Sequence, residues 1–331
     1  MSDLPLNNLN GKLPPPDHPG LGLVRVTEAA ALAAGRWMGL GDRAAADRAA
    51  QEAMAQALDL LSMRGRIISG EELRIGEHSP LDSGKDVGRG EGPDMDVEVN
   101  AIDGAALAAE GRTGAISAAA LAPRGCMWTP GPAVYLNKLV VDRTVAGAIG
   151  PEALDAPAGW TLALVARQKG KDIRDLVVFV VARPRHQDLI QEIRRAGARV
   201  FLRNGGDISG ALMAADPHTP VDLLMGVGGA AEGLLSACAV KALGGVMLCR
   251  VSPQSEGEKE ACLEAGMELN RILTCEDMVA GDKVYFSATG VTDSVLLEGA
   301  HYHGDTAETQ SMVLRFETGT RRMIKTEHRL K

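Results

Sequence analysis

Aromatic side chains are scarce in this sequence. Phe, Trp and Tyr make up 3% of its 331 residues, whereas hydrophobic residues as a group make up 45%. A chain of this length can bury a substantial core, and here Ala, Val, Leu and Met must fill most of it. The length corresponds to two domains or to one large α/β unit.

Cysteine is also rare, and the number of cysteines is odd. None of the five belongs to a Cys-x-x-Cys pair, a spacing that is typical of zinc sites and redox motifs. They are Cys126, Cys238, Cys249, Cys262 and Cys275. This pattern indicates reduced structural thiols, as in the cytoplasm. We therefore predict a cytoplasmic protein.

Long apolar runs and basic runs are both missing. No apolar stretch reaches the roughly 18 residues of a membrane-spanning helix, and the first residues do not read as an export leader. The net charge is −8, which argues against nucleic acid and anionic membrane surfaces as partners.

The N-terminal half mixes helices and strands. Residues 1–20 are rich in proline and predict a disordered arm. Helical periodicity covers 24–38, where Thr27 can cap, and 43–63, which Asp42 opens. Strands are expected at 66–69, 95–102, 114–121 and 135–142, with an irregular loop over 73–93.

After the Pro- and Gly-rich segment 150–159 the pattern becomes that of an α/β protein. Residues 176–181 are a nearly continuous β-branched run, as in buried parallel strands. They are followed by a helix, a strand, a helix and a strand, at 187–196, 200–202, from 207, and 223–227. This order predicts a doubly wound sheet with a ligand site at the carboxyl ends of its strands.

The C-terminal part adds a strand at 283–290 and an antiparallel end at 311–327. From the change of pattern we expect an N-terminal α+β metal-site domain over 21–158. A C-terminal α/β domain is expected over 159–331.

The segment 94–105 alternates acidic and apolar residues as a strand does and then turns on Gly104. Carboxylates also lie on several separate segments beside small residues, at Asp47, Glu71, Asp103 and Glu232. Magnesium or manganese takes oxygen ligands from several elements, and substrate phosphate completes the coordination. Ordinary solvated carboxylates explain the same residues, so spacing alone leaves both interpretations open.

Two arginines, Arg183 and Arg185, follow the strand at 176–181. The guanidinium group offers paired donors that suit phosphate, although a solvated loop is the alternative. His186, next in the chain, is expected to cap or contact the following helix rather than to bind metal.

Glycine-rich turns at 204–207 and 226–233 lead from strand to helix. Such turns expose backbone N–H groups that stabilise anions. The second turn begins as Gly-Val-Gly, but Ala231 occupies the last glycine position of the dinucleotide fingerprint. Nicotinamide binding is therefore not expected.

In this order the segments resemble the class II fructose-1,6-bisphosphatases of bacteria, members of the magnesium-dependent sugar-phosphatase superfamily. The likeness runs from Val24 to about Arg322 and is strongest at 25–32, 41–47, 182–186, 228–233, 286–290 and 296–299. It implies a layered α/β/α/β/α fold. It also implies a Mn²⁺- or Mg²⁺-dependent fructose-1,6-bisphosphate 1-phosphatase of gluconeogenesis or Calvin-cycle carbon metabolism, and a homo-oligomer, either a dimer or a tetramer.

The resemblance also assigns roles to individual residues. Its metal ligands fall on Asp47, Glu71, Asn100, Asp103 and Glu232. Its sugar-phosphate contacts fall on Tyr135, Arg183, Arg185, Asp207 and the backbone of Gly229.

The catalytic motif departs from the family pattern. The family's Asp-Pro-Ile-Glu-Gly-Thr is Asn-Ala-Ile-Asp-Gly-Ala over 100–105. Asn100 replaces an Asp and removes one negative charge, and Asp103 is one methylene shorter than the usual Glu. Ala105 replaces the threonine thought to position the attacking water, and Gly205 replaces an Asp in the sugar-binding turn.

Because of these departures no residue is assigned as catalytic. One hypothesis is a working sugar-bisphosphate phosphatase. The alternative is a catalytically impaired paralogue that binds a sugar phosphate or regulates an active homologue.

Overall fold

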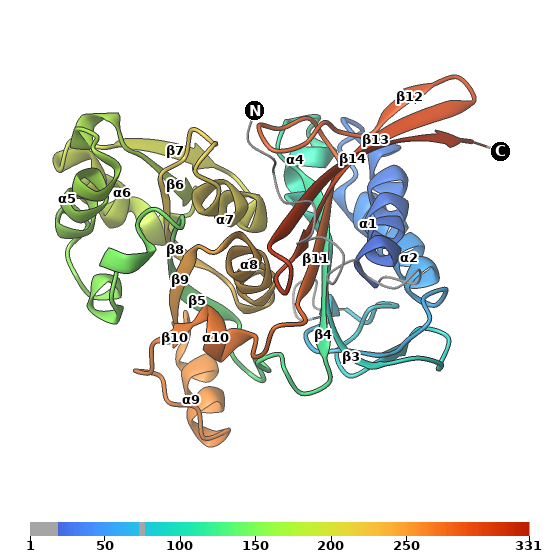
Figure 1. Ribbon diagram of the computed structural model, residues 1–331, viewed down its shortest axis with the longest axis horizontal. Helices are drawn as coiled ribbons and strands as arrows, with labels where there is room; N and C mark the ends of the chain where they lie inside the picture. Colours follow the sequence, from blue (N-terminus) through green and yellow to red (C-terminus); the bar gives the residue numbers. More distant parts are fainter. Residues whose placement is uncertain (1–18, 73–76, 331) are drawn as a thin grey trace, which may run out of the picture.

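The computed structural model describes residues 19–72 and 77–330. Within these ranges the chain forms two mixed β-sheets with helices on their faces (Figure 1). The prediction of a mixed α/β protein is confirmed.

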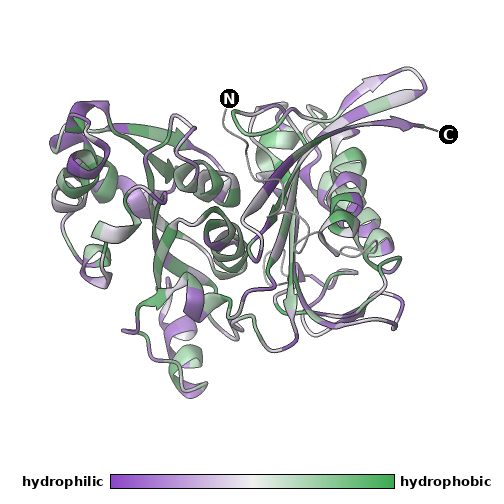
Figure 2. Cartoon of the chain, in the orientation of Figure 1, coloured by the Kyte–Doolittle hydropathy of each residue, from purple (hydrophilic) through white to green (hydrophobic). Residues whose placement is uncertain are grey.

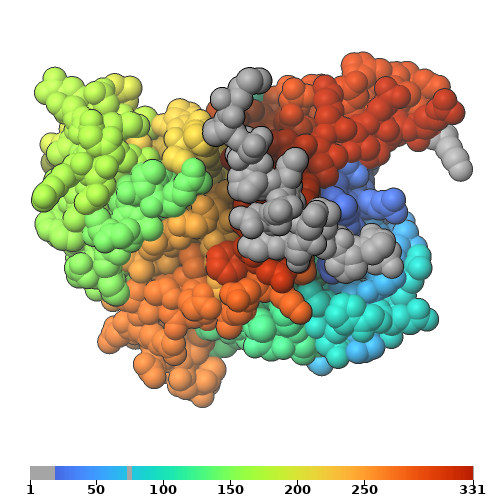
Figure 3. Space-filling view, in the orientation of Figure 1, coloured from blue at the N-terminus to red at the C-terminus, as the bar shows by residue number. Residues whose placement is uncertain are grey.

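The first sheet is built from both ends of the chain. Its strands are β1 (Arg64–Ile67), β2 (Asp86–Val87), β3 (Asp94–Asp103), β4 (Ile116–Pro123), β11 (Tyr285–Gly290), β12 (His301–His303), β13 (Thr306–Arg315) and β14 (Thr320–Arg329). The order is β12-β13-β11-β4-β3-β1-β2, and β14 pairs with β13. The β12–β13 hairpin and the end of β14 project at one corner of the molecule (Figure 1 and Figure 3).

The second sheet contains the predicted βαβαβ unit. Its strands are β5 (Tyr135–Val141), β6 (Val177–Val181), β7 (Arg199–Arg203), β8 (Leu223–Gly229), β9 (Val246–Val251) and β10 (Leu273–Thr274), in the order β10-β9-β5-β8-β6-β7. Strands β6, β7 and β8 are parallel, as predicted. Strand β5 runs antiparallel to both β8 and β9 and therefore makes the sheet mixed.

Helices occupy three layers around the sheets. Helices α5 (Ala158–Lys169) and α6 (Gln187–Arg195) cover the outer face of the second sheet, whereas α1 (Pro19–Gly35) and α2 (Arg43–Leu58) cover the outer face of the first (Figure 1). Helices α7 (Asp207–Ala215) and α8 (Ala230–Leu243) lie between the two sheets.

The remaining helices are short. They are α4 (Ala105–Ala109), α9 (Glu256–Glu264), α10 (Cys275–Met278), and the 3₁₀ turns η2 (Ala146–Ala148), η3 (Pro151–Leu154), η4 (Ile173–Asp175) and η5 (Pro184–His186).

Small side chains fill much of the core, as the scarcity of aromatics predicts. On β4, Ala118 and Ala120 face the central layer, whereas Ala119 and Leu121 face α1 and α2. Alternation on the strand produces this division. The central helices are mostly hydrophobic (Figure 2), because α7 and α8 are covered by a sheet on each side.

The sheets do not follow the expected domain boundary between residues 158 and 159. Strand β5 lies before that boundary but belongs to the second sheet, and β11 to β14 lie after it but belong to the first. The chain returns because β4 pairs antiparallel with β11. Strand pairing between distant segments leaves no local mark in the sequence.

Several local predictions need correction. The expected arm 1–20 overlaps α1, which begins at Pro19, since proline is tolerated in the first turn of a helix; residues 1–18 lie outside the described ranges. Thr27 is not a cap. It lies inside α1, and its hydroxyl contacts the carbonyl oxygen of Val24 (3.1 Å) and the hydroxyl of Ser287 (3.0 Å).

The start of α2 is confirmed. The Asp42 side chain accepts a hydrogen bond from the amide of Ala45 at 2.9 Å, although the helix ends at Leu58 rather than at the expected residue 63.

All five cysteines are free thiols. None of the helices in the described ranges combines the length and apolar character that crossing a membrane requires.

Candidate active site

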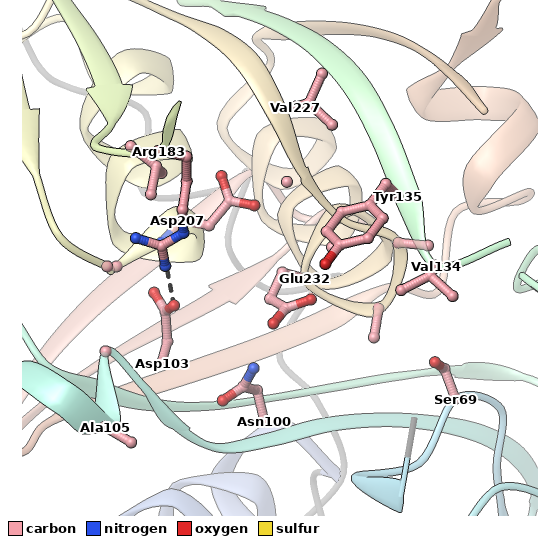
Figure 4. Close-up of a pocket in the computed structure, with 18 of the residues that line it drawn as sticks. Ser69, Asn100, Asp103, Ala105, Val134, Tyr135, Arg183, Asp207, Val227 and Glu232 are labelled. Carbon is pink, nitrogen blue, oxygen red and sulfur yellow. Dashed lines mark hydrogen bonds between the residues drawn. The ribbon is translucent and has the colours of Figure 1, made fainter. Parts of the chain in front are cut away.

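A cavity of about 380 Å³ lies between the two sheets, at the carboxyl ends of the parallel strands β6, β7 and β8. This is the predicted place for a ligand site. Most of the predicted site residues line it: Asn100, Asp103, Ala105, Tyr135, Arg183, Arg185, Asp207, Gly229 and Glu232. Figure 4 shows Asn100 and Asp103 of the first sheet across the cavity from Tyr135 and Arg183 of the second.

Asp47 and Glu71 are not among the residues that line the cavity. Asp47 lies on α2 and forms an ion pair with Arg43 at 3.6 Å, and it is Arg43 that reaches the cavity. The buried carboxylate of Glu71 accepts a hydrogen bond from the amide of Ala101 at 2.7 Å. Glu71 therefore lies next to β3, close to Asn100, but does not itself line the cavity.

Asp103 ties the first sheet to helix α7. Its two carboxylate oxygens accept hydrogen bonds from the amides of Asp207 (3.1 Å) and Ser209 (3.0 Å), which are exposed at the start of that helix. Burial raises the pKa of Asp103 to about 7, with smaller contributions from the nearby carboxylates of Asp207 and Glu232. The side chain thus positions the glycine-rich turn at 204–207 as well as facing the cavity.

Two glycine turns meet at this point. Gly104 has φ +86° and leads into α4, whose first residue is Ala105. A Cβ atom at Gly205 would lie 3.3 Å from the Cα of Gly104, a tight contact. The close approach of the two turns explains why the smallest residue suits position 205.

Arg183 and Arg185 are both held by backbone carbonyl groups. Arg185 donates to the carbonyl oxygen of Val227 at 3.0 Å and lies over the Tyr135 ring, 4.7 Å from its centroid. Arg183 donates to the carbonyl oxygen of Asn204 at 2.9 Å. Because a guanidinium group has five N–H donors, each arginine keeps donors for an anion in the cavity.

His186 is the N-cap residue of α6, and its side chain connects two strands. Its Nδ1 atom lies 2.6 Å from the carbonyl oxygen of Val181, and its Nε2 accepts from the amide of Val227 at 2.8 Å. These partners require a neutral ring with its proton on Nδ1, and burial lowers the pKa of His186. His186 thus holds the predicted place at the start of the helix, but its ring makes no capping hydrogen bond and bonds to β6 and β8 instead.

Lys138 is a functional candidate that the sequence pattern did not single out. It is 1% exposed, lies on β5 and forms an ion pair with Asp207. Gly228 makes this pair possible, since a Cβ atom there would lie 2.0 Å from an Asp207 carboxylate oxygen and 2.7 Å from Lys138 Nζ. A lysine inside the apolar strand 136–141 was the available signal.

Glu98 is a second functional candidate that the sequence pattern did not single out. It lies on β3 and is fully buried. Burial raises the pKa of Glu98 well above its ordinary value, and the carboxylates of Glu232 and Glu71 add to the effect even though the Ser69 amide opposes it. Several carboxyl groups thus gather on this side of the cavity, and burial disfavours the charged form of Glu98.

The described residues contain no group of three or more His, Cys, Asp or Glu side chains that could hold a metal ion. The donors nevertheless fit a hard divalent cation. Asn100 Oδ1 is buried at the cavity and has no hydrogen-bond partner in the described structure, and Glu232 also lines the cavity. Magnesium commonly takes only one or two carboxylates and relies on water and substrate phosphate for the rest.

A doubly wound sheet with arginines and glycine turns at its carboxyl edge, facing carboxylates, defines an enzyme-type site for a small phosphorylated ligand. Residues 18–328 match the family described as bacterial fructose-1,6-bisphosphatase, glpX-encoded. The chain therefore belongs to this family, as the sequence resemblance predicts.

Curated relatives agree with this assignment. The chain is 39% identical over 319 residues to the fructose-1,6-bisphosphatase class 2 of Haemophilus influenzae, covering 92% of this chain and 94% of that protein. It is 37% identical to the fructose-1,6-bisphosphatase 1 class 2 of Escherichia coli K12, with the same coverage.

Proposed function

We propose that this chain is a fructose-1,6-bisphosphatase that removes the 1-phosphate of its substrate by metal-dependent hydrolysis. The observation that carries the proposal is one cavity in which Arg183, Arg185 and Tyr135 from the second sheet lie across from Asn100 of the first sheet and Glu232 at the start of α8. The names of the relatives, at 39% and 37% identity, support the same substrate. Sugar-bisphosphate hydrolysis places the chain in gluconeogenic carbon metabolism.

The arginine side of the cavity binds substrate phosphate. Charge-assisted hydrogen bonds from planar guanidinium groups fix both the position and the orientation of a phosphate. Tyr135 adds a hydroxyl donor, and the Asp207 carboxylate, held by Lys138, accepts hydrogen bonds from sugar hydroxyls. The backbone at Gly229, where β8 ends, leads into α8 and favours an anion at the start of that helix.

The carboxylate side of the cavity holds Mn²⁺ or Mg²⁺. Glu232 and Asn100 at the cavity, with Glu71 directly behind, supply the oxygen ligands, and Asp103 completes the acidic wall. A divalent cation bound there would neutralise charge that develops on the phosphoryl oxygens. Asp47 stays a predicted ligand that the geometry supports least, because it faces Arg43.

The apolar side chain of Ala105 is the feature of the cavity that favours the alternative function. It lines the cavity at the start of α4 but carries no atom that can orient water. Ser69 has a buried hydroxyl without a hydrogen-bond partner among the described residues, yet Figure 4 shows Ser69 and Ala105 on opposite sides of Asn100. The alternative is a paralogue that binds a sugar phosphate with little turnover or regulates an active homologue.

Phosphate release from fructose 1,6-bisphosphate in the presence of Mn²⁺ tests the proposal. Calorimetric binding of the same ligand provides the second measurement. Release with saturation kinetics supports the enzyme, whereas binding without release supports the impaired paralogue. Absence of both at millimolar ligand would overturn both functions.

A repair variant distinguishes a degraded site from a working one. Asn100→Asp with Ala105→Thr restores a charge and a hydroxyl, so hydrolysis should rise well above that of the native chain if the site is impaired. Each change alone should do little, since groups that act as one unit are not additive. Equal activity of native chain and double variant would show that the native site already works.

Other predictions follow the family. A cytoplasmic location, a dimer or tetramer, and membership of the wider metal-dependent sugar-phosphatase superfamily stay predictions. Gel filtration with light scattering measures the oligomeric state directly.

A further inference from the structure

Glu98 has a carboxylate oxygen for which the described structure offers no partner. The side chain is 0% exposed. Its Oε2 accepts a hydrogen bond from the amide of Ser69 at 3.0 Å, whereas Oε1 has no hydrogen-bond partner among the described residues. Leaving a buried carboxylate oxygen unsatisfied costs free energy, so such an atom points to a missing partner.

Asn100 presents the same feature two residues further along β3. Its side chain is 3% exposed, and its Oδ1 likewise has no partner in the described ranges. Residues i and i+2 of a strand point to the same face of the sheet. Two unpartnered oxygens are thus aligned on the face of β3 that α8 covers.

The neighbouring segment places further oxygens beside this pair. The Ser69 amide bonds to Glu98, and in return the Ala101 amide bonds to Glu71 at 2.7 Å. These two bonds join the segment 69–71 to β3 and place Glu71 beside the stretch that carries Glu98 and Asn100. Glu232, at the start of α8, faces the same stretch from the other side of the cavity (Figure 4).

Asp96 lies on the same face of β3 and is a buried carboxylate that has a cationic partner. It is also buried, at 1% exposure, and its Oδ1 likewise makes no hydrogen bond to the described residues. That oxygen, however, forms an ion pair with Arg124 at 3.5 Å, and Oδ2 accepts from the Met127 amide at 3.1 Å. One buried carboxylate on this face of β3 is thus paired with an arginine, whereas Glu98 has no such partner among the described residues.

We propose that Glu98 is a ligand of the divalent cation, acting with Oδ1 of Asn100 and supplying the negative charge that the amide lacks. The cation is of the Mn²⁺ or Mg²⁺ class, because all available donors are oxygens. This inference rests on the proposed function only in that the same cation serves the phosphatase site.

Direct titration of Mn²⁺ tests the assignment without relying on turnover. The full-length chain is stripped with a chelator, and free Mn²⁺ is measured by electron paramagnetic resonance. Glu98→Gln keeps the shape of the side chain and removes its charge, so Mn²⁺ affinity should fall at least about tenfold. The matched control, Asp96→Asn, should change the affinity by less than about twofold.

A rescue experiment separates ligation from general disruption. If Glu98 supplies the charge missing at position 100, then Glu98→Gln combined with Asn100→Asp should regain most of the Mn²⁺ affinity. Asn100→Asp alone keeps Glu98 and should bind Mn²⁺ more tightly than the native chain. The rise in melting temperature on adding Mn²⁺ should follow the same order.

Three outcomes would overturn the assignment: native affinity in Glu98→Gln, an equal loss in Asp96→Asn, or no Mn²⁺ binding by the native chain at millimolar metal. The first would identify Glu98 as a neutral, protonated side chain. A native chain that binds Mn²⁺ through Glu98 but releases no phosphate would uphold the assignment and overturn only the proposed enzyme.

Discussion

The second sheet carries lysine–aspartate ion pairs at two places, one away from the cavity and one beside it. Carboxyl groups near these two places differ in the direction of their pKa shifts. Away from the cavity, Asp142 and Asp222 flank the β5–β8 pair and contact Lys169, and Asp222 also contacts Lys171. Near the cavity, Lys138 contacts Asp207.

The acid–base properties reflect this difference. Although burial acts against it, hydrogen bonds from Lys169 and Thr144 hold the pKa of Asp142 below its ordinary value, and Lys171 and Lys169 do the same for Asp222. At the cavity, burial and neighbouring carboxylates raise the pKa of Asp103. The fold thus pairs Asp142 and Asp222 with lysines, whereas Asp103, at the cavity, has no such cation among the described residues to offset its burial.

The largest expected effect comes from removing either buried lysine. Lys138→Met and Lys169→Met each leave a buried aspartate without its cation, which typically costs about 3–5 kcal/mol. Urea unfolding should show similar losses in stability. Only Lys138→Met should also weaken fructose 1,6-bisphosphate binding, because Asp207 lines the cavity and Asp142 does not.

A double variant makes this comparison sharper. Lys138→Met with Asp207→Asn removes both charges and should recover much of the lost stability but none of the lost binding. Recovery of binding as well would show that the Lys138–Asp207 pair serves the fold alone.

The second effect is a contrast in pH dependence. The pKa of Asp103 is about 7 in the folded chain, roughly three units above an unfolded Asp, so at most about 4 kcal/mol of stability is involved. Below about pH 4 the carboxyl is protonated in both states, and its contribution to stability is complete. As the pH rises toward 7, the unfolded chain releases a proton that the folded chain keeps, and stability falls.

Asp103→Asn should abolish this fall between about pH 4 and 7 when unfolding is measured with a chelator present. Loss of one hydrogen bond shifts its curve by an amount that does not depend on pH. Asp142 behaves in the opposite way: its lowered pKa gives stability that is present above an ordinary Asp pKa and is lost on acidification. Asp142→Asn should therefore reduce the acid sensitivity, and parallel curves for the two variants would contradict the comparison.

The smallest of these effects concerns substrate affinity. Arg185→Ala removes charge-assisted hydrogen bonds worth about 1.5–3 kcal/mol, so binding of fructose 1,6-bisphosphate should weaken by roughly ten- to a hundredfold. The control is Arg199→Ala, an exposed arginine at the other end of the parallel strands that pairs with Asp175. It should leave affinity unchanged, and calorimetry measures both.

Much of the site was open to prediction because its residues carry local signals. Arg183 and Arg185 follow a β-branched strand, and glycine turns precede α7 and α8; both patterns place a site at the carboxyl ends of parallel strands. The cavity contains them as expected. The alternating acidic strand at 94–103 was also clear, because period-two patterning depends only on neighbouring residues.

Other features were decided by tertiary structure. Nothing local indicates that β11 pairs with β4, that β5 crosses into the second sheet, or that His186 joins β6 to β8. Burial decided the rest: the sequence places Lys138 and Glu98 within strands, and only packing between two sheets removes them from water. The sequence by itself determined the elements and the kinds of chemistry, because these depend on short-range pattern. The tertiary structure decided which charges lie together, because desolvation and pairing depend on segments far apart in the chain.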